Sequence, residues 1–595
     1  MTKKHFLTRI TASAVSVCMM LHFYPRVSIT ADYSIPSMPD FSYMGAVGNL
    51  TAEQTKTAAE AVYGALYMHE NEANFAACGI SMTSDNTSDL VSVFRHVSAC
   101  YDVGILMKKG PISYSPKKST ITISYIYDGS EYEEKYLEYT SIMDGILSGV
   151  DENWSDEEKA LYLHDYLCVK YDYDYPWLYG AAVREGKEPY SAFGLIKNGL
   201  SVCEGYSELY AKLMNKLGIH TQIVTSDTLG HAWNLVTISG NNYFVDVAWD
   251  DSYKEYKGSV GHYNFLKTSE ELIEANHDAT DWKDVYGNSV YDLAVPDTFS
   301  NAFWNFTDKA IKPYGNGWLT VTGSFNNVNI ELLVYDPATH SAAASDFMDT
   351  IPSSESTWFI WDNPGAYWEE IFTVIDTAND ILYYTAPTSI YAYNNGKSVK
   401  VYELNNEEMS KGYIYGMYCE GDTLYYGLDT ERFFVDEMGD VPIEYYSLKL
   451  SDIENTVIAE TGEPASRTTP PDESTTTTTE STTTTSETTT TTATKTTTVS
   501  SSVTTVTTAP PPTEPQTGDI DGNGLIDAVD ASKLLSYYAK ISTDPSFNVT
   551  DELKLIADVD KNGTIDAVDA SKLLSYYAYL STHTETLSLN DFLSK

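Results

Sequence analysis

A long threonine-rich tract divides this chain of 595 residues. Residues 461–516 are mostly Thr with Ser, Pro and a few Glu, and three consecutive prolines stand at 510–512. Such a segment carries too little apolar surface to offset the entropy lost on ordering, so we expect a disordered linker. The chain is also too long for one hydrophobic core. It is therefore predicted to be multidomain, with folded parts on both sides of the tract.

The first 31 residues have the pattern of a secretory signal peptide. Lys3, Lys4 and Arg9 precede an apolar stretch at 10–24, and small residues follow at 28–31. The apolar stretch is short and interrupted by polar residues, which favours a cleaved signal over a membrane span. An N-terminal anchor is the alternative. We expect a secreted, extracellular protein that is not embedded in a membrane.

Charge and cysteine content narrow the choice of partners. With 84 acidic and 37 basic residues the formal net charge is −47, which argues against nucleic acid and fits a protein that binds cations. The cysteines that follow the signal are Cys78, Cys100, Cys168, Cys203 and Cys419. An odd number leaves at least one thiol without an intramolecular partner. Cys78 and Cys100 could form a disulfide.

Hydrophobic periodicity indicates two further regions. Residues 32–149 mix a helical pattern at 58–69 with an alternating strand pattern at 119–127, and predict an α+β extension. Residues 290–460 carry short aromatic strands between Gly, Asn and Asp turns, and predict an all-β module. The pattern Asp-x-Leu-Tyr-Tyr occurs twice in this module, which favours a propeller, with a sandwich as the alternative.

A 12-residue acidic loop occurs twice after the tract. Carboxylates or amides stand at loop positions 1, 3, 5, 9 and 12, position 7 offers a backbone carbonyl, and Gly524 and Gly563 fall at position 6. Calcium prefers oxygen ligands in this spacing, with a sharp turn at the glycine. We therefore expect two calcium ions. The predicted ligands are Asp519, Asp521, Asn523, Leu525, Asp527, Asp530, Asp558, Asp560, Asn562, Thr564, Asp566 and Asp569.

Each loop ends in Asp where an EF-hand usually has Glu, and each leads into a single helix. Residues 517–595 in this respect resemble a type I dockerin. The resemblance implies an α-helical domain with paired EF-hand-like calcium loops. It also implies a cohesin on a scaffold protein as partner, and assembly into a cellulosome-like complex concerned with polysaccharide catabolism.

A cysteine begins a predicted helix in the middle of the chain. Cys203 follows Gly199-Leu200-Ser201-Val202, and the next residues form an apolar stripe at helical spacing. The members of the stripe are Tyr206, Leu209, Tyr210, Leu213 and Leu217. The dipole and free N–H groups at a helix N-terminus favour thiolate over thiol. Cys203 is therefore a candidate nucleophile.

A predicted β-hairpin follows, with His231 on its first strand and Asp246 on its second. His231 could accept the thiol proton, and Asp246 could orient the imidazole. A turn centred on Gly240-Asn241 predicts that position 235 lies opposite Asp246, so His231 and Asp246 share a face but lie roughly 13 Å apart along the strand. A bulge or asymmetric loop would have to bring them together.

The motifs Val-Cys-Glu-Gly-Tyr-Ser, His-Ala-Trp-Asn and Tyr-Phe-Val-Asp-Val-Ala-Trp-Asp-Asp occur in this order, with Leu-His-Asp-Tyr-Leu upstream and Tyr-Asn-Phe-Leu downstream. They resemble the secreted bacterial branch of the transglutaminase-like superfamily. The resemblance implies a papain-like α+β catalytic domain at 150–285 without a cofactor. It assigns Cys203 as nucleophile, His231 as general base and Asp246 as orienting acid.

Together these features predict a cysteine acyl-transfer enzyme that acts on protein or peptide. Water as acceptor would make it a peptidase or deamidase, and an amine would make it a cross-linker. One alternative is a non-catalytic binding protein whose β module recognises a cell-wall glycan. Another is a polysaccharide-degrading component of the complex, for which the sequence nominates no site residues.

Overall fold

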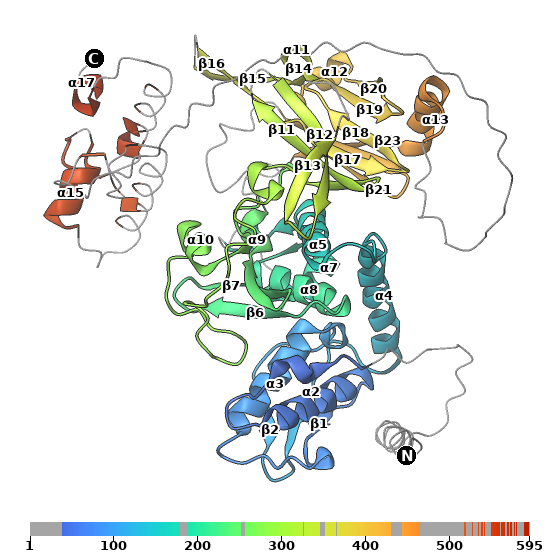
Figure 1. Ribbon diagram of the computed structural model, residues 1–595, viewed down its shortest axis with the longest axis vertical. Helices are drawn as coiled ribbons and strands as arrows, with labels where there is room; N and C mark the ends of the chain where they lie inside the picture. Colours follow the sequence, from blue (N-terminus) through green and yellow to red (C-terminus); the bar gives the residue numbers. More distant parts are fainter. Residues whose placement is uncertain are drawn as a thin grey trace, which may run out of the picture. The chain divides into compact units, whose positions relative to one another are not determined.

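The computed structural model describes residues 38–464, except for 179–187, 252–255, 325–326, 346–350, 364–365 and 430–442, together with scattered residues between 517 and 593. The predicted signal peptide and most of the threonine-rich tract lie outside these residues. The chain divides into two compact units, Met1–Ser474 and Thr475–Lys595 (Figure 1). Among the described residues, no helix is long and apolar enough to span a bilayer.

The first unit begins with the α+β extension. Its helices are α2 (Ala52–Tyr67), α3 (Thr87–Cys100) and α4 (Gly129–Leu147), and its antiparallel sheet has the order β1-β3-β2. The strands are β1 (Glu72–Asn74), β2 (Tyr114–Ser115) and β3 (Thr120–Thr122). The helix predicted at 58–69 starts six residues earlier, because Thr51 and Gln54 form a capping box. The strand predicted at 119–127 is shorter than expected.

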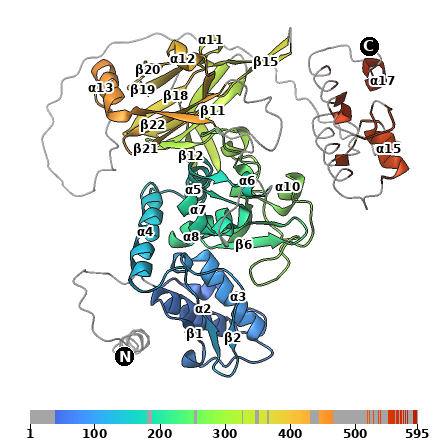
Figure 2. The same ribbon diagram turned by 180° about the vertical axis from the view of Figure 1, so that it is seen from behind.

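The middle of the first unit packs helices against one antiparallel sheet. The helices are α5 (Asp156–Lys170), α6 (Tyr175–Leu178), α7 (Ala192–Asn198), α8 (Cys203–Lys216), α9 (Val247–Asp250) and α10 (Ser269–Glu274). The sheet has the order β6-β7-β8-β9, with β6 (Thr221–Ser226), β7 (His231–Ile238), β8 (Asn241–Val245) and β9 (Phe265–Lys267). Helix α8 contacts β6 and β7, so the element that starts at Cys203 lies against the strand that starts at His231. Figure 2 shows α8 beside β6 of the same sheet.

The rest of the first unit is mainly β, as predicted for 290–460, and its strands form successive antiparallel sheets. The first contains β10 (Lys312–Tyr314), β11 (Gly317–Ser324), β12 (Asn327–Asp336), β13 (Ser341–Ser345) and β14 (Ile351–Pro352). The second pairs β15 (Trp358–Asn363) with β16 (Ala366–Glu370). The third contains β17 (Ile375–Ala378), β18 (Ile381–Thr385), β19 (Ser389–Asn394) and β20 (Lys397–Glu403). The fourth contains β21 (Tyr413–Glu420), β22 (Thr423–Asp429) and β23 (Glu444–Lys449), followed by α13 (Leu450–Thr461).

The repeated Asp-x-Leu-Tyr-Tyr pattern falls at the same place in two of these sheets. It enters β18 in the third sheet and β22 in the fourth, each the second strand of an antiparallel meander. The propeller itself stays a prediction.

The β module is joined to the middle of the unit through α5. Trp318 Nε1 on β11 donates a hydrogen bond to Glu158 Oε1 at 2.9 Å, and Tyr335 on β12 bonds Glu157 at 3.1 Å. Glu158 also closes the capping box with Ser155 that starts α5. The acidic first turn of α5 therefore both caps the helix and accepts the hydrogen bonds from the β module.

The second unit contains α15 (Asp551–Ala557) and α17 (Leu589–Leu593) among its described elements. Its apolar cluster includes Ile526 and Ile565, the residues at position 8 of the two acidic loops. Both are buried in that cluster, so the two loops share one small core.

Candidate active site

Cys203 is the first residue of α8 and lines a cleft of about 920 Å³. Its side chain is largely buried, and Ser207 Oγ donates a hydrogen bond to its carbonyl oxygen. Helix α8 can start here because Gly205 has no side chain: a β-carbon at that position would lie 1.9 Å from Ser201 Oγ. The N-terminal end of α8 thus places a thiol in a solvent-connected cleft.

The β7–β8 hairpin brings His231 and Asp246 into contact. His231 Nε2 lies 2.5 Å from Asp246 Oδ2, and both side chains are buried. The predicted register was wrong by two residues: Ile238 pairs with Asn241 around a Ser239-Gly240 turn, so position 233 rather than 235 lies opposite 246. Strand β8 ends at Val245, and Asp246 leaves the ladder to cap α9. His231 is therefore offset from Asp246 by two residues along the strand instead of four, and Asp246 turns out of the strand at its end. Together these features bring the two side chains into contact without a bulge in the hairpin.

Asp246 is fully engaged by hydrogen bonds. Its Oδ1 accepts from the backbone N–H groups of Ala248 and Trp249, at 3.1 and 3.2 Å, and its Oδ2 accepts from His231 and from His277 at 2.9 Å. Burial favours the neutral acid, but the two imidazoles outweigh it and hold the pKa of Asp246 well below its usual range. Asp246 is thus a fixed anion beside His231.

His231 is held in its charged form by its neighbours. Burial disfavours the imidazolium, but Asp246 and, to a smaller extent, a hydrogen bond with Cys203 raise the pKa of His231 to about 10. The indole of Trp249 stacks on the same ring, with centroids 4.6 Å apart, and is partly exposed. The structure therefore brings together the three side chains that sequence reasoning singled out.

A tyrosine that sequence reasoning missed also reaches Cys203. Tyr173 lies on β4 (Asp172–Tyr173), which pairs in parallel with β5 (Leu200–Ser201) just before the nucleophile. Its hydroxyl interacts with both the backbone N–H and the side chain of Cys203. Burial, with the nearby thiol, raises the pKa of Tyr173, which keeps the phenol protonated at neutral pH.

The N-terminal extension forms one wall of the cleft, contributing Arg95, Met107 and Lys109. Lys109 Nζ lies 2.7 Å from Glu204 Oε1 and 2.6 Å from Glu208 Oε1, both on α8. Burial opposes its charge, but these two carboxylates raise the pKa of Lys109. The extension is therefore bonded to the helix that starts at Cys203.

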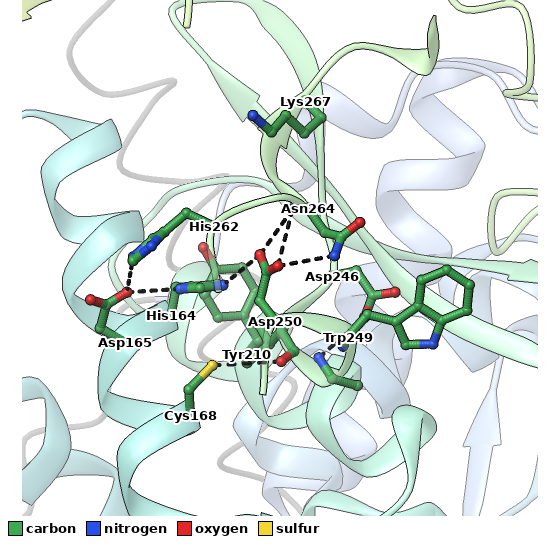
Figure 3. Close-up of polar contacts among 12 residues, drawn as sticks. His164, Asp165, Cys168, Tyr210, Asp246, Trp249, Asp250, His262, Asn264 and Lys267 are labelled. Atoms are coloured by element: carbon green, nitrogen blue, oxygen red, sulfur yellow. Dashed lines mark hydrogen bonds and ion pairs between the residues drawn. The ribbon is translucent and has the colours of Figure 1, made fainter. Parts of the chain in front are cut away.

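A second buried network lies next to Asp246, whose backbone N–H donates to the carbonyl oxygen of Asn264 at 2.9 Å (Figure 3). His164 bonds Asp165 through Nδ1 at 2.8 Å and Asp250 through Nε2 at 3.2 Å, and His262 Nε2 lies 3.1 Å from Asp165. Asp250 also accepts from the backbone N–H and the amide of Asn264. Burial opposes the charge of His164, but Asp165 and Asp250 raise its pKa to about 9. This network joins α5, α9 and the loop that leads into β9.

Two groups in this region could hold a metal ion, which sequence spacing did not indicate. They are His164–Asp165–His262 and His231–Asp246–His277, each with ligand atoms within 4.8 Å of one another. In the first group the four imidazole nitrogens and both carboxylate oxygens of Asp165 have hydrogen-bond partners. That group is therefore satisfied without a metal. In the second group both oxygens of Asp246 likewise already accept hydrogen bonds, Oδ2 from the two imidazoles and Oδ1 from two backbone N–H groups, so its carboxylate too is satisfied without a metal.

The calcium loops are described in part. Asp558, Asn562, Thr564 and Asp569 belong to the described residues, and the other predicted ligands lie outside them: Asp519, Asp521, Asn523, Leu525, Asp527, Asp530, Asp560 and Asp566. Asp558 Oδ2 accepts from the N–H of Gly563 at 2.9 Å, while the buried Oδ1 has no hydrogen-bond partner among the described residues. A buried carboxylate oxygen without a donor at loop position 1 fits a calcium ligand.

Comparison with known families agrees with this organisation. Residues 143–248 match the transglutaminase-like superfamily, and residues 517–576 match the dockerin type I domain. The first unit thus has a transglutaminase-like α+β core and the second a dockerin-like domain, which confirms both resemblances.

Comparison with curated proteins gives no match. Among solved structures, the chain is similar to a protein described as a TGase, with 16% identity over 23% of this chain and 43% of that one, at a TM-score of 0.17. It is also similar to an arylamine N-acetyltransferase of Mycobacterium marinum, with 11% identity over 44% and 87%, at a TM-score of 0.16. The chain thus spans less than half the length of the TGase.

Proposed function

We propose that this protein is a secreted cysteine acyl-transfer enzyme, tethered to a scaffold cohesin by a calcium-binding dockerin. One observation carries the enzymatic part: a thiol at the N-terminus of α8 shares a cleft with an imidazole that a buried carboxylate holds at 2.5 Å. Cys203 is the nucleophile, His231 the general base and acid, and Asp246 orients His231.

The reaction proceeds through a thioester. The thiolate of Cys203 attacks the carbonyl carbon of a peptide or side-chain amide, forming a C–S bond, and the C–N bond then breaks as His231 gives its proton to the leaving nitrogen. Water or an amine next attacks the thioester and loses a proton to His231. The C–S bond breaks and the thiolate returns. We favour water as acceptor, because it is abundant outside the cell.

Two donors are placed to stabilise the oxyanion of the tetrahedral intermediate. One is the backbone N–H of Cys203, and the other is the hydroxyl of Tyr173, which interacts with that N–H and with the Cys203 side chain. Donors fixed where negative charge develops lower the barrier without reorganising at the moment of reaction. The protonated phenol of Tyr173 suits that task.

The second unit supplies attachment. Calcium would be held by the paired acidic loops, with Asp558 and Asp569 among its ligands, and would neutralise carboxylates that otherwise repel one another. The adjoining helices then bind a cohesin, which places the enzyme in a cellulosome-like complex. The acidic chain and the orphaned Asp558 oxygen support this part of the proposal.

The experiment compares wild type with Cys203→Ala on a set of glutamine-containing peptides, with and without a primary amine. Mass spectrometry distinguishes cleavage, deamidation and amine incorporation. We expect one of these products from the wild type and none from the variant. Equal product from both proteins would exclude the cysteine mechanism. Absence of product from both, with a Cys203 that alkylates no faster than the other thiols, would favour a binding role for the central domain.

A further inference from the structure

A fourth residue, His277, is hydrogen-bonded to Asp246 of the proposed triad, and the backbone fixes its position. Helix α10 ends in a Schellman-type cap: Asn276 has φ +75°, its N–H bonds the carbonyl of Ile273, and the N–H of His277 bonds the carbonyl of Leu272 at 3.0 Å. The residue after such a cap usually packs inward. His277 follows this rule, with no exposed surface.

His277 and His231 donate to the same oxygen. Their Nε2 atoms lie 2.9 and 2.5 Å from Asp246 Oδ2, whereas Asp246 Oδ1 is occupied by two backbone N–H groups. The other nitrogen of His277, Nδ1, is buried and has no hydrogen-bond partner among the described residues. A proton there would be a buried donor without an acceptor, so His277 is the neutral tautomer that carries its proton on Nε2.

Aromatic rings enclose this hydrogen bond. The His277 ring lies 4.0 Å from that of Trp249, 5.1 Å from that of Trp233 and 6.3 Å from that of Trp282, measured between centroids. An apolar enclosure strengthens the electrostatic effect of each hydrogen bond, because water cannot screen it. The hydrogen bond from His277 therefore partly neutralises the negative charge on Asp246 Oδ2 and weakens the hydrogen bond between that oxygen and His231.

We propose that His277 is a positioning residue of the catalytic site, which fixes Asp246 Oδ2 and weakens the hold of Asp246 on the His231 proton. This inference rests on the acyl-transfer function proposed above. In that reaction His231 must both keep a proton while the thiolate attacks and release it to the leaving nitrogen. A carboxylate bonded to one imidazole only would retain that proton more strongly. His277 thus adjusts the basicity of His231 to the second of these tasks.

The titratable groups around His231 come from several elements. Cys203 faces it from α8, Asp246 from the start of α9 and His277 from the loop after α10, while Tyr173 on β4 interacts with Cys203 and Asp246. A probe of the His231 proton must therefore distinguish the imidazolium from the thiolate.

Paired alkylating agents provide such a probe without a substrate. Iodoacetate is drawn to a thiolate that faces an imidazolium, and iodoacetamide is not, so the ratio of their rates at Cys203 falls as His231 loses its proton. The ratio is measured against pH by mass spectrometry of the Cys203 peptide, in full-length protein. In His277→Phe we expect the fall to move upward by about one pH unit, since a hydrogen bond to the Asp246 charge is lost.

Matched variants separate this effect from packing. His277→Gln keeps an amide N–H that can reach Asp246 Oδ2, and should restore the wild-type profile. His96→Phe is the packing control, because His96 is also buried, bonds Tyr43 through Nε2 and has an unpartnered Nδ1. It should not move the profile. His277→Leu serves as a second donor-free variant should the phenylalanine not be accommodated.

The outcomes distinguish this inference from the function on which it rests. A wild-type ratio that falls with pH, but at the same or a lower pH in His277→Phe and His277→Leu, would overturn the role of His277 and leave the triad in place. A wild-type ratio that never exceeds that of Cys78 would instead contradict the Cys203–His231 pair. As a check without substitution, nitrogen NMR of histidine-labelled protein should show His277 as the neutral Nε2–H tautomer at pH 7, and the Nδ1–H form would overturn the inference.

Discussion

Lys109 Nζ in the N-terminal extension lies 2.6 Å from Glu208 Oε1, on the helix that begins at Cys203. A second lysine makes contacts in the opposite direction: Lys212 Nζ on the same helix donates hydrogen bonds to the carbonyl oxygens of Ser98 and Tyr101 in the extension, at 2.9 Å each. The extension is therefore part of the cleft wall and not an independent appendage. Its contribution can be measured through the stability of the first unit.

Lys109→Met should lower the free energy of unfolding by about 3 kcal/mol, because it leaves the buried Glu208 without its cation. Lys118→Met is the control: Lys118 pairs with Glu72 at 3.4 Å on an exposed surface, where such a pair contributes less than about 1 kcal/mol. Chemical denaturation of full-length protein measures both. Equal, small effects would mean that the extension does not depend on this contact.

Tyr173→Phe should lower kcat roughly 100- to 1000-fold, the usual loss on removing one oxyanion donor. Alkylation of Cys203 by iodoacetamide needs no oxyanion stabilisation, so its rate should stay within about twofold of wild type. Steady-state kinetics on a peptide substrate and timed alkylation provide the two readouts. A parallel loss of both rates would instead indicate that Tyr173 supports the thiol itself.

The stability of the first unit should depend on pH through His164. Its pKa is raised from 6.5 to about 9 in the folded state, so its ion pairs stabilise the fold fully below pH 6.5 and progressively less as pH rises towards 9. The lowered pKa of Asp165 adds stability above about pH 4 that is lost on acidification. The Tm of the wild type should thus fall between pH 6.5 and 9. His164→Leu should unfold at lower temperature with a flatter dependence over that range, and an unchanged slope would contradict this assignment.

Calcium should bind the full-length chain at two sites, as measured by isothermal titration calorimetry. Asp558→Ala removes the buried loop oxygen that lacks a hydrogen bond, and should abolish one of the two. Asp452→Ala, an acidic residue in the first turn of α13, is the charge-matched control and should leave both. Absence of heat in the wild type would exclude the calcium-dependent dockerin.

The sequence predicted the local elements well and the long-range contacts poorly. The apolar spacing at 158–169 predicts a helix, and the structure has α5 at Asp156–Lys170, because this spacing and the Ser155–Glu158 capping box are local signals. Cys203 could be placed at a helix start for the same reason. The hairpin register failed by two residues, since Ser239-Gly240 and Gly240-Asn241 are both acceptable turns and nothing local separates them.

His277 and Tyr173 were missed for a different reason. His277 meets Asp246 across 31 residues, and Tyr173 reaches Cys203 through a two-residue parallel pairing, so neither contact has a periodic trace in sequence. The available signal for His277 was the cap of α10, where a Thr268 capping box and Asn276 mark the helix ends. The contact of Lys109 with α8 was missed for the same reason, because α4 and α5 lie between them in the sequence and no local pattern links the two.

The most direct test of the catalytic proposal is competition among the protein's own thiols. Folded protein at pH 6 is treated with limiting iodoacetamide, and each cysteine peptide is quantified by mass spectrometry. Cys203 should react first although it is largely buried, because its thiol faces the His231 imidazolium. Cys78 is an exposed residue, but partial burial of its thiol raises its pKa. Faster labelling of Cys78 than of Cys203 would contradict the account.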